Sequence, residues 1–188
     1  MCDFIAGTVE KAPARALELG CAEASFLIEA FGRFPDCRWT GVDVSAYALA
    51  RSREVLPTAA LCRCTVTELP FADASFDLVT AFDVLEHVPD LPAALKEIRR
   101  VIRHRGTLVA SVPVYDGPMG VLVRALDRDP THVHRRNRRW WLSERLNADF
   151  RLLRWHGVWR YYLGRYWHFR SQIFRCVSPA IVTAWEPR

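Results

Sequence analysis

Short apolar runs alternate with amphipathic stretches along the first 113 residues. We expect strands at residues 14–20, 38–44, 59–65, 76–82 and 107–112. Their apolar, β-prone composition is typical of strands buried on both faces of a sheet. Helical spacing of apolar positions predicts helices at residues 23–31, 46–55 and 91–104. Strands that alternate with helices over short links predict an α/β fold with a doubly wound, mostly parallel sheet.

Residues that start or stop helices support these boundaries. Ser45 and Asp90 precede the second and third helical stretches, and their side chains suit the N-cap position. Pro57 closes the second helix, and Gly106 is expected to end the third. The boundaries therefore predict three strand–helix–strand connections before residue 113.

After residue 113 the rhythm changes. We expect helices at 119–126 and 138–146 and further strands at 150–155 and 180–185. Residues 160–170, between these strands, are rich in aromatic and basic side chains, and we expect them to fold over one edge of the sheet. No linker or repeat divides the chain, so we expect one domain over 1–188, with halves 1–113 and 114–188.

Polar groups gather where the fourth predicted strand ends. Asp83, Glu86 and His87 follow the apolar run 76–82 directly, and Pro89 then stops the strand. Ligands of open α/β sheets bind outside the carboxyl ends of the strands. This stretch is therefore the expected centre of a functional site.

The same stretch carries a family resemblance. The order and spacing of Leu-Pro-Phe at 69–71, Ser-Phe-Asp-Leu-Val at 75–79 and Asp-Val-Leu-Glu-His-Val-Pro-Asp at 83–90 resemble the middle of a class I S-adenosylmethionine-dependent methyltransferase of the small type 11-like family. The resemblance covers roughly residues 14–113. It implies a Rossmann-like sheet of seven strands with an antiparallel last strand, S-adenosylmethionine as cofactor, and an enzyme.

The turn after the first strand departs from the family pattern of an acid followed by three alternate glycines. Glu18 and Gly20 are kept, but Ala22 and Ala24 replace the other two glycines. We expect the turn to survive with negative φ at both alanines, because alanine has the smallest side chain after glycine. Gly20 and Ala22 then let the backbone approach the cofactor.

An acid at the end of the second strand suits ribose binding. Asp43 lies 23 residues after Gly20, a spacing at which a carboxylate accepts from two ribose hydroxyls. A Rossmann-type dehydrogenase has an acid at the same place, so Asp43 alone does not distinguish the two families. The motifs at 69–90 favour the methyltransferase. Asp43 and its neighbour Val44 are expected to contact the cofactor.

The resemblance also implies contacts farther along the chain. Thr65 and Val66 should meet the adenine, and Phe82 and Asp83 should border the sulfonium and methyl group. The family often has an aspartate at the Thr65 position, so the adenine contact here is expected to use the Thr65 hydroxyl and the Val66 backbone.

The acceptor side offers histidines and arginines. His87 is the candidate base at a strand end, and His132 is the candidate on the loop after the fifth strand. The cluster of Asp83, Glu86 and His87 resembles a metal-binding cluster of some quinone-ring and small-RNA methyltransferases, but we expect no metal here. Four arginines should flank the mouth and attract an anionic substrate or surface: Arg135, Arg136, Arg138 and Arg139.

Charge and composition sharpen the picture only in the second half. Residues 1–110 carry a net charge of −3, whereas residues 111–188 carry +8 and six of the seven tryptophans. Such a region suits an anionic or amphipathic partner, and solvated surface arginines are the alternative. The chain has no apolar run long enough for a membrane span and no signal pattern, so we expect a cytoplasmic protein with reduced cysteines.

These observations predict S-adenosylmethionine-dependent O- or N-methylation of a small, anionic or aromatic acceptor. Two alternatives stay open. Ala22, Ala24 and Thr65 would suit a binding or partner protein that has lost catalysis. The basic, aromatic second half would suit an RNA methyltransferase, although it contains no recognisable RNA-binding module.

Overall fold

The computed structural model describes residues 1–143, 149–162, 166–173 and 175–188. Within these residues one sheet holds eight strands in the order β3-β2-β1-β4-β5-β8-β6-β7. The strands are β1 (Arg15–Leu19), β2 (Arg38–Asp43), β3 (Ala60–Arg63), β4 (Phe76–Phe82), β5 (Ile102–Pro113), β6 (Phe150–Tyr162), β7 (Tyr166–Ser171) and β8 (Ala180–Pro187). The helices are α1 (Cys2–Ala6), α2 (Ser25–Arg33), α3 (Ala46–Val55), α4 (Leu91–Val101), α5 (Gly117–Leu126) and α6 (Arg138–Ser143), with a 3₁₀ turn η1 (Leu85–His87).

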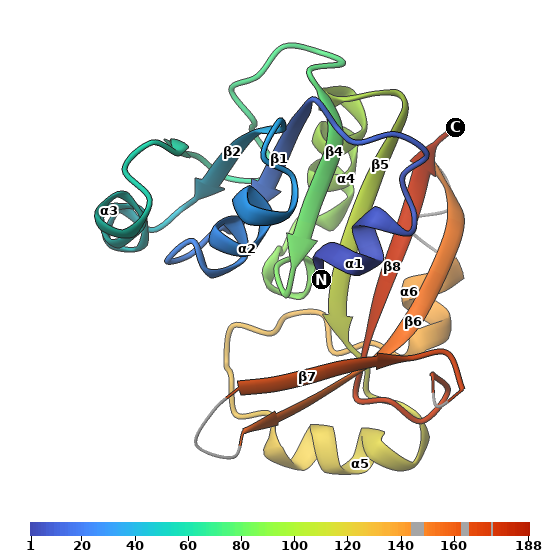
Figure 1. Ribbon diagram of the computed structural model, residues 1–188. Helices are drawn as coiled ribbons and strands as arrows, with labels where there is room; N and C mark the ends of the chain where they lie inside the picture. Colours follow the sequence, from blue (N-terminus) through green and yellow to red (C-terminus); the bar gives the residue numbers. More distant parts are fainter. Residues whose placement is uncertain (144–148, 163–165, 174) are drawn as a thin grey trace.

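Strand directions confirm the expected doubly wound, mostly parallel sheet. β3, β2, β1, β4 and β5 run parallel, and β8 pairs antiparallel with β5. The predicted count of seven strands is wrong, because β6 turns back into β7, which pairs antiparallel with it. This hairpin projects beyond the carboxyl ends of the parallel strands toward α5 (Figure 1).

Alternate residues of the strands pack into two apolar layers. Leu17 and Val79 face the α4 side, where Leu95 and Ile98 are buried against them. Leu78, on the opposite face of the sheet, packs with α1 and α2 residues. In Figure 1, α1 and α2 lie in front of the sheet and α4 lies behind it. Helices on both faces explain why the strands are apolar along their whole length.

The boundary between α4 and β5 differs from the prediction. The helix ends at Val101 and the strand begins at Ile102, whereas the sequence suggested a helix to residue 104 and a strand from 107. Ile102 pairs with Phe76 and is buried, and the register shifts before the next pair. Burial of Ile102 between strands outweighs its helical spacing.

Part of the aromatic and basic second half is core. Trp141, Trp185 and Phe150 are fully buried in the layer on the α4 side. Arg138 is also buried, and its guanidinium donates to the carbonyls of Cys176 and Ser178 at 2.9 and 2.8 Å. These residues therefore stabilise the fold rather than face a partner.

The expectation that residues 160–170 fold over the sheet edge falls mostly on residues or side chains outside the described part of the structure. Backbone pairing places 160–162 in β6 and 166–170 in β7. Residues 163–165 and the side chains of 160–169 lie outside the described part of the structure. Within the described ranges, none of the helices combines the length and apolarity that a bilayer crossing requires.

Candidate functional site

The turn after β1 needs glycine at its first position. Gly20 has φ +65°, and a Cβ there would lie 2.5 Å from Cγ2 of Val84. Any side chain would meet both the strained backbone region and this close contact. Gly20 thus lets β1 and the turn after β4 approach each other.

Ala22 and Ala24 adopt glycine-like backbone angles, which corrects the expectation of negative φ. Their φ angles are 45° and 63°. Three hydrogen bonds hold the turn. The Ala22 N–H donates to Asp43 Oδ2 at 2.9 Å, and the Ala22 carbonyl accepts from the Ser52 hydroxyl at 2.6 Å. The Ala24 N–H donates to the Cys21 carbonyl at 2.8 Å. The left-handed region costs an alanine roughly 1–2 kcal/mol. The turn therefore takes positive φ at three positions although two of them carry alanine.

Asp43, at the end of β2, is fixed by backbone amides. Oδ2 accepts from Ala22 N–H, and Oδ1 accepts from Ser45 N–H at 2.8 Å. Each carboxylate oxygen keeps a second lone pair. The carboxylate is therefore oriented in advance and can still accept from two hydroxyl groups.

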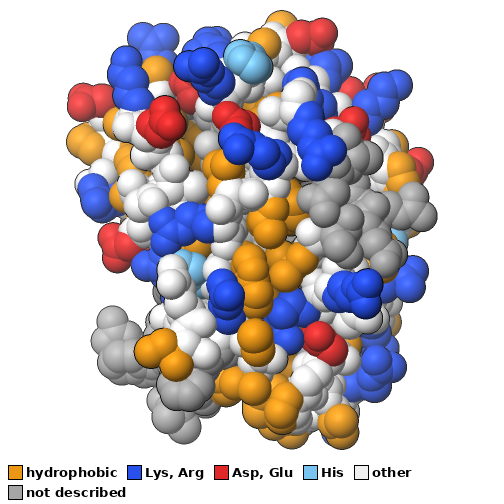
Figure 2. Space-filling model, turned by 90° about the vertical axis from the view of Figure 1, so that its right-hand side faces the viewer, with side chains coloured by type: hydrophobic (Ala, Val, Ile, Leu, Met, Phe, Trp, Pro, Cys, Tyr) orange, Lys and Arg blue, Asp and Glu red, His pale blue; other side chains and the backbone are white. Residues whose placement is uncertain are grey.

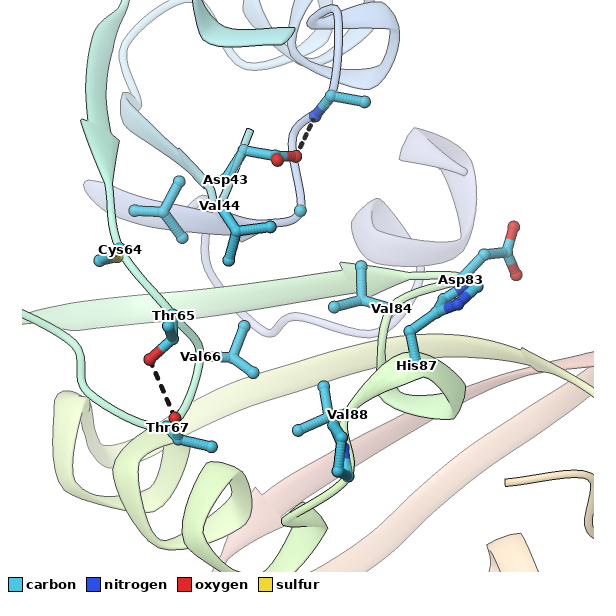
Figure 3. A pocket seen from close by; sticks show the side chains of 14 residues that line it. Asp43, Val44, Cys64, Thr65, Val66, Thr67, Asp83, Val84, His87 and Val88 are labelled. Atoms are coloured by element: carbon cyan, nitrogen blue, oxygen red, sulfur yellow. Dashed lines mark hydrogen bonds between the residues drawn. The ribbon is translucent and has the colours of Figure 1, made fainter. Parts of the chain in front are cut away.

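A cavity of about 480 Å³ opens at the carboxyl ends of β1, β2 and β4. Asp43 lies on one side of it and His87 on another, with the side chains of Val44, Val66 and Val84 between them (Figure 3). The lining residues are Gly20, Ala22, Val42, Asp43, Val44, Cys64, Thr65, Val66, Thr67, Asp83, Val84, His87, Val88 and Pro89. Most of the residues expected to bind the cofactor thus share one cavity.

Two of the expected cofactor residues do not line this cavity. Glu18 is buried beneath the turn, and burial together with the charge of Asp43 raises the pKa of its carboxyl to about 8. Glu18 is therefore mostly neutral at pH 7. Phe82 packs edge-on against Phe26 of α2, with ring centroids 4.7 Å apart.

Thr65 and Asp83 line the cavity, and each forms a hydrogen bond with another side chain of the protein. The Thr65 hydroxyl lies 2.9 Å from the Thr67 hydroxyl (Figure 3). Asp83 has φ 57°, and its Oδ1 accepts from the Ser111 hydroxyl at 3.1 Å. Asp83 N–H also donates to the Ser111 carbonyl, so this residue ties the end of β4 to β5.

Sequence reasoning missed six lining residues, among them Val84, Val88 and Cys64. Each lies within a few positions of an expected residue, so strand-end position was the available signal. The apolar members give the cavity walls that suit a flat ring.

His87 and His132 are brought together on the acceptor side, with ring centroids 4.5 Å apart. His87 Nδ1 lies 2.8 Å from Thr131 Oγ1, and this hydroxyl donates to Asp129 Oδ1 at 2.5 Å. His132 Nδ1 lies 2.9 Å from Asp127 Oδ2. Each imidazole is therefore oriented by a carboxylate, directly or through one hydroxyl.

Asp127 is the hub of this arrangement. Although burial opposes it, hydrogen bonds from Tyr115 and His132 lower the pKa of Asp127 to about 2. The Tyr115 hydroxyl donates to the same Oδ2, and Arg135 Nε lies 3.1 Å from it. Sequence reasoning missed Asp127 and Tyr115, because neither stands at a predicted strand end.

The four arginines expected at the mouth have different environments. Arg135 is engaged with Asp127, and Arg136 lies over the Trp140 ring at 5.0 Å from its centroid. Arg139 is exposed, whereas Arg138 is buried and so does not belong to a rim. Figure 2 shows Lys and Arg side chains spread over the visible face rather than gathered in one patch.

Comparison with known proteins gives a consistent picture. Residues 17–110 match the family model described as "Methyltransferase domain". A probable S-adenosylmethionine-dependent methyltransferase of Mycobacterium tuberculosis is 35% identical over 99 residues, which cover 52% of this chain and 35% of that protein. A demethylmenaquinone methyltransferase of Roseiflexus castenholzii is 37% identical over 99 residues, which cover 50% of this chain and 40% of that protein.

Among solved structures, a methyltransferase of Thermotoga maritima, titled a possible histamine N-methyltransferase, superposes with a TM-score of 0.74. It is 15% identical, and the match covers 98% of this chain and 86% of that one, which shows a shared fold. The chain spans only 35–40% of the length of the two curated relatives.

Proposed function

The chain belongs to the S-adenosylmethionine-dependent methyltransferases of the methyltransferase-domain family, and we propose that it methylates an oxygen or nitrogen of a small anionic or aromatic acceptor. Its cofactor is S-adenosylmethionine. This cofactor supplies a methyl group on a sulfonium sulfur, so transfer leaves a neutral thioether and releases one proton from the acceptor. The protein's contribution is position and the exclusion of water.

The cavity residues fit this cofactor. Asp43 would accept from the ribose hydroxyls, since amides already orient both of its oxygens. Val44 and Val66 would pack against the adenine, with the Thr65 hydroxyl beside them. Gly20 lines the cavity at the turn after β1, where its backbone would face the amino-acid end of the cofactor.

Four further expected residues have supporting roles in this proposal. Ala22 donates to Asp43 and so orients the carboxylate. Glu18 and Phe82 lie behind the cavity wall, where they support the turn and α2. Asp83 closes the cavity beside His87 and is expected near the sulfonium.

His87 and His132 are the proposed acceptor-side residues. His87 lines the cavity and also contacts the His132 ring, so it stands where cofactor and acceptor would meet. With Nδ1 of each ring hydrogen-bonded, the Nε2 atoms remain for an acceptor's proton.

Retention of the turn favours a methyltransferase over a non-catalytic relative. The non-catalytic alternative rested on Ala22 and Ala24, yet both residues take positive φ, and the Ala22 amide still donates to Asp43. The RNA alternative rested on the basic second half, of which Arg138, Trp141 and Trp185 are core residues.

The observation that carries the proposal is the oriented carboxylate of Asp43 on the wall of the 480 Å³ cavity. Isothermal titration calorimetry with S-adenosylmethionine tests it. Asp43→Ala removes two charge-assisted hydrogen bonds of about 1.5–3 kcal/mol each, so the affinity should fall at least tenfold.

Asp36→Ala is the matched control, because Asp36 is exposed and lies just before the other end of the same strand. It should leave the dissociation constant unchanged. An unaltered constant in Asp43→Ala, with native circular dichroism, would remove Asp43 from the cofactor site.

A further inference from the structure

Three side chains with metal-binding atoms converge beside the cofactor cavity. One ligand atom from each of Glu86, His87 and His132 lies within 4.8 Å of the other two. Glu86 and His87 come from η1, whereas His132 comes from a loop 45 residues later. Asp83, which the sequence placed in the cluster, is not part of this group.

Backbone hydrogen bonds fix the loop against η1. The Glu86 carbonyl accepts from both Val133 N–H and His134 N–H at 3.0 Å. His134 Nε2 lies 2.8 Å from the Val88 carbonyl, which adds a third link. The fold therefore builds the cluster, and its geometry does not depend on a chance approach of exposed side chains.

Hydrogen bonding sets the tautomer of His132. A carboxylate can only accept, so the proton between Asp127 and His132 lies on Nδ1 of the imidazole. In the neutral ring Nε2 then carries a lone pair. A carboxylate behind a histidine is the arrangement that orients metal-binding imidazoles.

The same reasoning applies to His87 through one more group. The Thr131 hydroxyl donates its proton to Asp129, so its oxygen accepts from Nδ1 of His87. Nε2 of His87 therefore also carries a lone pair when the ring is neutral. Two independent relays give the two imidazoles the same tautomer.

We propose that Glu86, His87 and His132 bind a divalent first-row transition metal ion, of which Zn²⁺ is the representative. Two imidazoles and a carboxylate form a common three-ligand set for catalytic zinc, which leaves coordination positions open. Bonds of about 2.0–2.2 Å place donors roughly 3–4 Å apart, so small rotations suffice from the observed arrangement. Mg²⁺ prefers oxygen ligands and fits this set poorly.

The ion would define the acceptor class, an inference that rests on the proposed function. His87 lines the cofactor cavity, so the open positions lie next to the expected methyl group. An acceptor hydroxyl bound there would lose its proton near neutral pH, as metal-bound water does. The imidazoles would then act as ligands, and the favoured acceptor would carry an oxygen donor.

Titration with Zn²⁺ alone, after treatment with a chelator, tests the site. The native chain should bind one equivalent of Zn²⁺ at the cluster. Co²⁺ bound in its place should give the visible absorption bands of a coordinated ion. Glu86→Gln and His132→Ala should each weaken this binding at least 100-fold. Asp127→Asn keeps all three donors and should weaken it about 10- to 100-fold.

His104→Ala is the matched control, because His104 is exposed near the start of β5, away from the cluster. It should bind Zn²⁺ like the native chain. Binding that survives both Glu86→Gln and His132→Ala would assign the ion elsewhere, for example to Cys62 and Cys64, and would overturn the proposal.

Titration of the same samples with S-adenosylmethionine separates the two proposals. Cofactor binding without any Zn²⁺ binding would overturn the metal site and leave the methyltransferase proposal intact. Zn²⁺ binding without cofactor binding would overturn the proposed function and support the metal site.

Discussion

The two sides of the cavity are built by different means. On the cofactor side the backbone sets the shape, through positive φ at Gly20, Ala22 and Ala24 and through amides that hold one carboxylate. On the acceptor side backbone hydrogen bonds dock the loop on η1, and relays of side chains orient the imidazoles of His87 and His132.

This difference separates a side with strict backbone requirements from a side that can be adjusted by single side chains. A turn fixed by backbone angles tolerates few substitutions, because any side chain meets the same steric limits. A relay of side chains can be altered one residue at a time without loss of the sheet. The acceptor side is therefore where a change of substrate costs the fold least.

Gly20→Ala should have the largest effect, because it attacks the backbone side directly. Positive φ and the 2.5 Å approach to Val84 together should lower the free energy of unfolding by about 2–4 kcal/mol. Cofactor binding should vanish at concentrations that saturate the native chain. Chemical denaturation and calorimetry measure the two effects.

Combining Gly20→Ala with Val84→Ala sharpens this prediction. The second change removes the close contact but not the backbone strain, so part of the stability should return. A single Gly20→Ala variant with native affinity would show that the turn does not depend on its backbone.

Asp127→Asn should have the next largest effect and should leave cofactor affinity unchanged. It disturbs the tautomer of His132, so turnover should fall about 10- to 100-fold. The test uses an acceptor found by screening with labelled cofactor, and Asp36→Asn is the control. Equal losses of affinity and turnover would argue against two separate sides.

Asp127 also predicts a pH dependence. Its pKa is about 2 in the folded chain and about 3.9 in an unfolded one, so it contributes stability above pH 4 that is lost as the pH falls toward 2. The contribution is about 2 kcal/mol, since the carboxylate is largely buried. Asp127→Asn should flatten this part of a stability–pH curve measured by denaturation.

Arg136→Gln should have a smaller effect, confined to the acceptor. Arg136 is exposed and stacks on Trp140, so its loss should raise the acceptor KM about three- to tenfold, less so at high salt. Arg38→Gln, at the opposite edge of the sheet, is the control. An acceptor KM that is unchanged in Arg136→Gln would argue against a role of Arg136 in substrate binding.

Ala22→Gly and Ala24→Gly should have the smallest effects and the opposite sign. Each relieves a positive φ, so each should stabilise the chain by about 0.5–1 kcal/mol while cofactor affinity is kept or improved. Ala50→Gly in helix α3 is the control and should destabilise by about 1 kcal/mol. Lower stability in both turn variants would show that positive φ does not strain the backbone at Ala22 and Ala24.

Features that depend on neighbouring residues could be predicted from the sequence. The cavity turn and Asp43 follow from local strand–turn–helix patterns, and Gly20, Ala22 and Asp43 line the cavity, whereas Phe82 at the end of β4 does not. The sign of φ at Ala22 could not be predicted, because a distant amide acceptor, Asp43, holds that angle.

Features that depend on contacts between residues far apart in the sequence could not be predicted. Nothing local indicates that the loop at 131–134 docks on the Glu86 carbonyl, so the contact between His132 and His87 could not be predicted. Arg138 is buried through carbonyls 38 and 40 residues away, and its neighbours in sequence made it look like a surface arginine.

The position of β8 has a consequence for folding during synthesis. β8 lies between β5 and β6, so the strand that joins the β6–β7 hairpin to the sheet leaves the ribosome after both strands of that hairpin. Until Ala180–Pro187 emerges, β5 presents an open apolar edge and the hairpin has nothing to dock on. The apolar edge of β5 therefore stays open until the last of the described strands has formed, so folding leaves this edge exposed to intermolecular pairing for longest.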